Sequence, residues 1–227
     1  MTTTLVLWDI DNTLLYTGGA GSVGMRRAFQ HLYGIDDAFR RVEFSGRTDT
    51  AILLDALREH HLEPQDIPGE IDRFVDAYIP QLETALQEMR GALMPGVLQI
   101  LERLSAHDGV ALGLGTGNFR RGGRTKLSHY GIEQFFPGVQ GGFGEDSPDR
   151  TEVIRLGIER MTDGARPARI VVVGDTPHDV SAACANGAFA LAVATGRNSA
   201  EELRSLGADE ALDDLSHVER VVSIILG

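Results

Sequence analysis

The spacing of hydrophobic and polar positions divides the chain into two parts. From about residue 18 to 92 the apolar residues recur with helical spacing, and no run shows the alternation typical of a strand. From residue 93 onward, short apolar runs alternate with amphipathic stretches, and one more apolar run, residues 4–9, stands near the start of the chain. This pattern predicts an α/β part that is interrupted by a helical segment.

Each short apolar run of the α/β part is predicted to be a buried strand, and the stretches between them helices. After the first run, the expected strands are "VALGLGT", "ARIVVVGDT", "AFALAVATG" and "ADEALDDL", with "VQGGF" as a weak one. Strands and helices that alternate in this way indicate a parallel sheet with helices on both faces. We therefore expect a doubly wound α/β core formed by residues 1–17 and 93–227, and an inserted all-helical cap formed by residues 18–92.

Residues that begin or end helices support this division. In the helical segment, Gly34 is expected to end one helix and Thr48 or Asp49 to cap the next. Pro80 should kink or break a third helix, because proline lacks the backbone N–H group. Ser199 is the expected cap of a helix near the end of the chain.

Composition is that of an ordinary globular protein and excludes some partners. Among 227 residues, 33 acidic side chains outnumber 21 basic ones, which gives a formal net charge of −12. Such a surface repels nucleic acids and anionic membranes, so we expect neither as a partner. The N-terminal stretch lacks the basic region of a signal peptide, and no apolar run reaches the roughly 20 residues of a membrane span. With Cys184 as the only cysteine, a cytoplasmic location is expected.

Polar side chains gather where three of the predicted strands end. Asp9 and Asp11 follow the first strand, Thr116 ends "VALGLGT", and Asp175 and Asp179 follow "ARIVVVG". The carboxyl ends of parallel strands meet at one edge of a doubly wound sheet, where its active site lies. Four carboxylates at one edge would repel one another without a cation, and oxygen ligands of this kind favour Mg²⁺. The sequence therefore predicts a magnesium site.

The end of the second strand offers a different chemistry. Thr116 carries a hydroxyl group, and the turn at Gly117 and Asn118 is expected to present free backbone N–H groups at a helix N-terminus. Such groups bind anions, and an anion site beside a metal site indicates phosphate.

These motifs resemble those of the haloacid dehalogenase superfamily, in its phosphatase branch. The first motif stands as Asp9-Ile10-Asp11-Asn12-Thr13, the second ends in Thr116, and the fourth stands as Gly174-Asp175-Thr176-Pro177-His178-Asp179. The resemblance covers nearly the whole chain, because a helical cap after the first strand is also typical of the phosphoglycolate-phosphatase-like members.

The resemblance implies a phosphatase that hydrolyses a small phosphorylated metabolite, a phosphate monoester, in two steps. Asp9 would attack phosphorus and form an aspartyl-phosphate, and Asp11 would protonate the leaving alcohol and then activate water. The metal ligands would be the side chains of Asp9 and Asp175 and the backbone carbonyl of Asp11, with Asp179 binding the ion or orienting its waters. Phosphate oxygens would be held by Thr116, Gly117 and Asn118.

The chain departs from the family at its third motif, which normally supplies a lysine before the "GD" strand. The corresponding stretch, "GEDSPDRTEVI", contains no lysine, and Arg150 is its basic residue. The single lysine of the chain, Lys126, lies on an earlier helix, where it is expected to be structural. We favour Arg150 as the catalytic, phosphate-binding cation, with Lys126 as the alternative.

Single residues distinguish the expected phosphatase from other enzymes of the same fold. A dehalogenase is disfavoured because Asp11 is present, and a phosphonate hydrolase because the cap contains no lysine. A phosphosugar mutase and a non-catalytic phosphate-binding protein remain as alternatives. Neither the identity of the phosphate ester nor the oligomeric state follows from the sequence.

Overall fold

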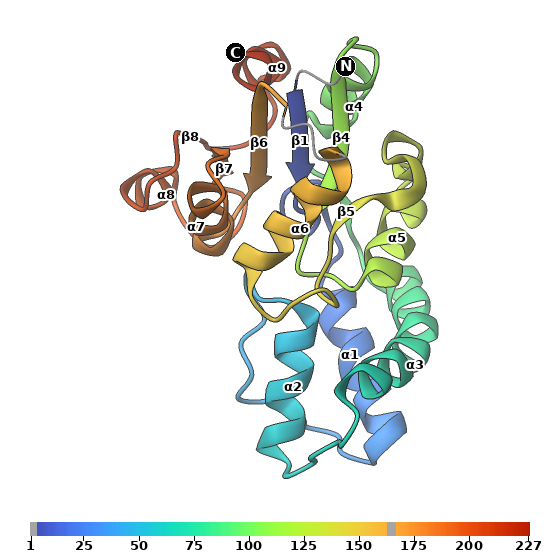
Figure 1. Ribbon diagram of the computed structural model, residues 1–227. Coiled ribbons are helices and arrows are strands. Elements are labelled where there is room, and N and C mark those ends of the chain that lie inside the picture. The colour runs from blue at the N-terminus through green and yellow to red at the C-terminus, as the bar shows by residue number, and fades with distance from the viewer. Residues whose placement is uncertain (1–3, 163–166) are drawn as a thin grey trace.

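The computed structural model describes residues 4–162 and 167–227 and contains a parallel sheet with the strand order β5-β4-β1-β6-β7-β8 (Figure 1). Its strands are β1 Thr4–Trp8, β4 Val110–Gly115, β5 Gly141–Gly142, β6 Arg169–Gly174, β7 Phe189–Val193 and β8 Glu210–Leu212. Every neighbouring pair is parallel. All residues of β1 are buried, as expected for a strand that is covered on both faces.

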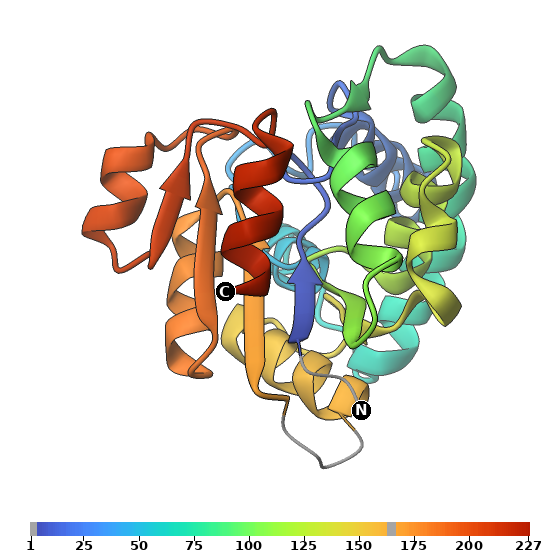
Figure 2. The same ribbon diagram turned by 90° about the horizontal axis from the view of Figure 1, so that it is seen from above.

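Helices cover both faces of this sheet (Figure 2), which confirms the predicted doubly wound architecture. Val6 and Trp8 of β1 pack with α4 (Val97–Ser105) and α9 (Val218–Leu226) on one face. Leu5 and Leu7 belong to the opposite cluster, beside α6 (Arg150–Thr162) and α7 (Pro177–Ala185). The remaining helices of this part are α5 Arg120–His129, α8 Ala200–Ser205 and the short 3₁₀ segments Glu133–Phe135 and Pro137–Val139.

The helices α1 (Ala20–Tyr33), α2 (Asp49–Glu59) and α3 (Ile67–Glu88) lie together beyond one end of the sheet (Figure 1). They share an apolar core of their own, which includes Phe29, Leu53, Phe74 and Leu82. Thr48, not Asp49, caps α2, because its hydroxyl oxygen accepts from the Ala51 N–H group. We propose residues 18–92 as the extent of this cap. No helix of the described residues is both long enough and apolar enough to cross a membrane.

Two details of the elements go beyond the expectation. Of the kink or break expected at Pro80, the break does not occur, because α3 continues through Pro80 as one element. The two-residue strands β2 (Leu15–Tyr16) and β3 (Ala92–Leu93) form an antiparallel pair where the chain enters and leaves the cap. No strand was expected at Ala92, because a two-residue strand is too short to show any periodicity.

Strand register explains why polar residues from distant segments meet. Trp8 pairs with Leu114 on one side and with Val173 on the other, so β1, β4 and β6 end at the same level. The residues that follow, among them Asp9, Thr116 and Asp175, therefore share one edge of the sheet. That edge faces the cap.

Candidate active site

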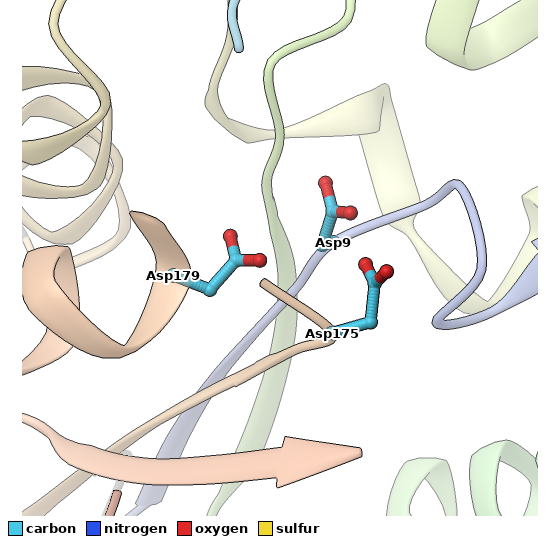
Figure 3. A group of neighbouring side chains, drawn as sticks. All are labelled: Asp9, Asp175 and Asp179. Carbon is cyan, nitrogen blue, oxygen red and sulfur yellow. The ribbon is translucent and has the colours of Figure 1, made fainter. Parts of the chain in front are cut away.

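The carboxylates of Asp9, Asp175 and Asp179 converge at this edge of the sheet (Figure 3). Each offers one oxygen atom, and these atoms all lie within 4.8 Å of one another. Asp9 follows β1, Asp175 follows β6, and Asp179 lies in the first turn of α7. All of these side chains are buried, so their charges are poorly screened by water.

Two glycines make room for the acids. A Cβ atom on Gly174 would lie 2.3 Å from the carboxylate carbon of Asp179, and one on Gly196 would lie 2.0 Å from Oδ2 of Asp175. Real Cβ atoms essentially never come this close, so a larger residue at either position would displace these carboxylates. Gly196 follows β7 and was not recognised in the sequence, where nothing near it suggested a site.

Arg150 is the cation of this cluster. Its side chain is 7% exposed, and its Nη2 atom lies 2.8 Å from Oδ1 of Asp9 and 2.7 Å from Oδ1 of Asp179. The same nitrogen donates to the carbonyl of Gly115 at 2.7 Å. Burial alone would lower the pKa of Arg150, but the carboxylates of Asp179 and Asp9 outweigh it, and the pKa lies above its usual value.

Both carboxylate oxygens of Asp179 accept hydrogen bonds from other residues of the protein. Its Oδ1 accepts from Arg150, and its Oδ2 accepts from the backbone N–H group of Thr176 at 3.1 Å and from the hydroxyl of Thr176 at 2.7 Å. Together Thr176 and Asp179 form a capping box that begins α7. Asp179 therefore holds Arg150 in place, which leaves the other two acids of the cluster more accessible to a metal.

Asp175 lacks a cation in this arrangement. No basic side chain of the described residues forms an ion pair with it, and its nearest side-chain donor is the Thr13 hydroxyl at 3.5 Å. Burial, followed by the charges of Asp9 and Asp179, raises the pKa of Asp175 to about 8. Burial also raises the pKa of Asp9 to about 6, although Arg150 opposes it. A buried, unpaired carboxylate with further carboxylate oxygens beside it fits Mg²⁺, which prefers such ligands.

Asp11 does not join this cluster, although four converging acids were expected. Its Oδ2 accepts instead from Nζ of Lys126 at 2.6 Å and from Nδ2 of Asn118 at 2.9 Å. The two candidate cations thus serve different acids: Arg150 contacts the first aspartate of the motif and Lys126 the second.

Thr116 is fully buried at the end of β4, and its hydroxyl oxygen accepts two hydrogen bonds from Asn118. These come from Nδ2 at 2.8 Å and from the backbone N–H group at 3.3 Å. With both acceptor positions used, the O–H bond of Thr116 remains to donate to a ligand. The N–H group of Asn118, expected to be free for an anion, is thus already engaged.

The start of α5 differs from the expected anion site as well. The N–H group of Phe119 donates to the Asp49 carboxylate at 2.8 Å, and that of Arg120 donates to the Glu145 carboxylate at 2.7 Å. The backbone of Asp49 also donates to the carbonyl of Gly117 at 2.7 Å, which links the cap to this loop. Burial raises the pKa of Asp49 to about 7, opposed by the charge of Lys126. The sequence indicated Asp49 only as a possible helix cap.

A cavity of about 330 Å³ lies over these groups, between the cap and the sheet edge. The core contributes Asp9, Asp11, Lys126, Arg150 and Asp175 to its lining, and the cap contributes Met25, Phe44, Ile52 and Tyr78. Arg47 also lines it, 27% exposed and 2.7 Å from Asp55. Both aspartates of the first motif, their cations Lys126 and Arg150, and apolar side chains of the cap therefore face a common space.

Comparison with known proteins gives a consistent result. A family model for haloacid dehalogenase-like hydrolases matches residues 6–193. Phosphoglycolate phosphatase of Synechococcus elongatus is 29% identical over 134 residues, which are 59% of this chain. The matched stretch spans 61% of that relative's length.

Solved structures show the same fold. CbbY from Rhodobacter sphaeroides, in complex with phosphate, has a TM-score of 0.70 at 18% identity over 96% of each chain. A proposed β-phosphoglucomutase from Thermotoga maritima has a TM-score of 0.63 at 23% identity over 99% of each chain.

Proposed function

Because the chain belongs to the haloacid dehalogenase-like hydrolases, we propose that it is a Mg²⁺-dependent phosphatase that transfers a phosphoryl group to Asp9 and then to water. The observation that carries this proposal is the placement of Asp9. It is a buried carboxylate at a strand end, between Arg150 and Asp175, and it lines the cavity together with Asp11. The similarity to a phosphoglycolate phosphatase supports a small phosphate monoester as the substrate.

Asp9 is the proposed nucleophile. Its carboxylate attacks phosphorus, the bond to the leaving alcohol breaks, and a carboxylate–phosphate bond forms, so that one difficult displacement is divided into two. Arg150 reaches Oδ1 of Asp9 and is therefore close enough to neutralise the equatorial oxygens of the transferring group.

Asp11 is the proposed acid and base. Its side chain is 37% exposed and lines the cavity two residues after the nucleophile. It gives a proton to the leaving oxygen in the first step and takes one from the attacking water in the second, which leaves it unchanged over a full turnover.

The metal would be held by the carboxylates of Asp9 and Asp175, with the backbone carbonyl of Asp11 as a further ligand. A bound Mg²⁺ ion offsets the repulsion between an anionic nucleophile and a phosphate dianion. Thr116 and the neighbouring N–H group of Gly117 would bind a phosphoryl oxygen, because the Thr116 hydroxyl has its donor position free.

The proposal is tested by measuring phosphate release from a panel of phosphate monoesters, with Mg²⁺ and with EDTA. The wild-type protein should release phosphate when Mg²⁺ is present and should release none in EDTA. Asp9→Asn, which keeps the shape of the side chain, should be inactive in both conditions. Activity retained by Asp9→Asn, or no release by the wild-type protein from any ester, would overturn the proposal. Conversion of a sugar phosphate to its isomer without phosphate release would identify a mutase.

A further inference from the structure

The ammonium group of Lys126 is buried beside the Asp11 carboxylate, where α5 faces the cap. The side chain is 3% exposed, and Nζ lies 2.6 Å from Oδ2 of Asp11 and 2.6 Å from Oδ1 of Asn118. Burying an ammonium group is costly unless it is paired and hydrogen-bonded. The position of Lys126 therefore depends on these two oxygen atoms.

Lys126 also determines which way the amide of Asn118 points. An ammonium group only donates hydrogen bonds, so the amide oxygen must face it and the amide nitrogen must face the other way. That nitrogen donates to Oδ2 of Asp11 at 2.9 Å and to Oγ1 of Thr116 at 2.8 Å. Lys126 thus holds the Asp11 carboxylate in two ways: by its own hydrogen bond and by orienting Asn118, which donates to the same carboxylate.

The other carboxylate oxygen of Asp11 is left available. In the described parts of the chain, residues 4–162 and 167–227, no hydrogen bond to Oδ1 of Asp11 is found. Asp11 lines the cavity, with its side chain 37% exposed. One oxygen is therefore fixed by two donors, while the other is free to face a ligand.

We infer that Lys126 is a positioning residue that fixes Asp11 for proton transfer to the leaving group, an inference that rests on the proposed function. The free oxygen carries the proton to the leaving oxygen as the phosphorus–oxygen bond breaks, and later accepts a proton from water. The place of Lys126 on an earlier helix suggested a structural lysine, whereas its contacts assign it to the second aspartate of the motif.

The cap contributes to this arrangement through α1. A Cβ atom on Gly21 would lie 3.2 Å from Nζ of Lys126, closer than such contacts normally are. Gly21→Ala should therefore displace the ammonium group slightly without removing its charge, and it provides a milder test than a substitution of the buried lysine itself.

The experiment compares Lys126→Met, Lys126→Arg and Gly21→Ala with the wild-type protein on alkyl phosphates and on p-nitrophenyl phosphate. Alkyl alcohols are poor leaving groups that need a proton, whereas p-nitrophenolate leaves without one. Lys126→Met should lower kcat on the order of 10²-fold for alkyl phosphates and only a few-fold for the aryl ester, with KM little changed. Lys126→Arg should keep part of the kcat that Lys126→Met loses. Gly21→Ala should also lower kcat more for alkyl phosphates than for the aryl ester, but by a smaller factor.

Arg124→Met serves as the control and should behave as wild type. Arg124 lies on the same helix as Lys126 and forms a surface ion pair with Glu133.

A double-mutant cycle supplies a second readout that needs no substrate. Lys126→Met and Asp11→Asn together should shift the unfolding midpoint by less than the sum of the single changes. An equal loss of kcat for both kinds of ester, together with additive midpoints, would overturn the inference. If the wild-type protein released no phosphate, the proposed function would fail and the kinetic role with it. The cycle would still decide whether Lys126 holds Asp11.

Discussion

Arg150 and Asp9 form a buried ion pair across the edge of the sheet, with 2.8 Å between the guanidinium nitrogen and the carboxylate oxygen. The arginine begins α6 and the aspartate follows β1, so the pair joins two segments that are far apart in the sequence. A second carboxylate, Asp179, holds the guanidinium from the other side. The family's third-motif lysine is absent, and this arginine provides a positive charge at the proposed nucleophile.

Arg150→Met should reduce both stability and activity. Two buried carboxylates would lose their cation, which typically costs about 3–5 kcal/mol of unfolding free energy. The value of kcat/KM should fall on the order of 10²-fold or more for every leaving group, because a donor to the phosphoryl oxygens is lost. Chemical denaturation and steady-state kinetics measure the two effects.

Arg155→Met is the matched control for this change. Arg155 lies on the same helix and is about half exposed, and it pairs with Glu152 and Glu159 at the surface. Such pairs contribute roughly 0–1 kcal/mol, so stability and kcat/KM should stay near the wild-type values. Equal effects of the two substitutions would remove Arg150 from the proposed mechanism.

Mg²⁺ should stabilise the protein through Asp175. Because the ion binds only the folded state, the melting temperature should rise with Mg²⁺ concentration and return to its starting value with EDTA. Asp175→Asn should abolish most of this rise without lowering the melting temperature in EDTA, since the carboxylate it removes has no ion-pair partner among the described residues. Asp36→Asn, at an exposed position, should respond to Mg²⁺ as the wild type does. A full Mg²⁺ response in Asp175→Asn would place the metal elsewhere.

Asp49 should make stability depend on pH. Burial raises the pKa of its carboxyl group from 3.8 to about 7, so between these values the folded state retains a proton that the unfolded chain has released. The free energy of unfolding therefore falls as pH rises through this interval. Asp49→Asn carries no charge and can still accept from Phe119. Its melting temperature relative to wild type should rise by a few degrees between about pH 5 and about pH 8, at roughly 2–4 °C per kcal/mol. A difference that does not change with pH would contradict this account.

Asp11→Asn should separate leaving groups by their need for a proton. Loss of an acid and base typically costs on the order of 10²–10⁴-fold, and the loss should be greater for alkyl phosphates than for p-nitrophenyl phosphate. Rates measured across a series of leaving groups test this expectation. A uniform loss across the series would mean that Asp11 only organises its loop.

The sheet and the ends of its strands could be predicted because each strand is recognisable from a short, local pattern of residues. "LVLWD" and "IVVVGD" are apolar runs that stop at an acid, and parallel strands bring such stops to one edge. The pair of short strands β2 and β3 shows no such pattern, because two residues cannot show a period.

The finer contacts of the site could not be predicted because they join distant segments. Asp49, the first residue of α2, and Glu145, in the loop after β5, reach the start of α5 and occupy N–H groups that we expected to bind an anion. Lys126 was recognised as the only lysine, but the side chain it would contact depends on how α5 packs over the loop that contains Asp11. The periodicity of apolar residues shows which face of a helix is buried, but it does not show which side chains of other elements that face contacts.

The phosphorylated state of Asp9 is the most direct test of the central proposal. If Asp11 activates water in the second step, Asp11→Asn should accumulate the phosphorylated enzyme when it is mixed with Mg²⁺ and an aryl phosphate and quenched in acid. Mass spectrometry of the intact chain should then show the added mass of one phosphoryl group, and peptide mapping should place it on Asp9. Release of the aryl alcohol without any added mass, or a phosphoryl group on another residue, would contradict the proposed nucleophile.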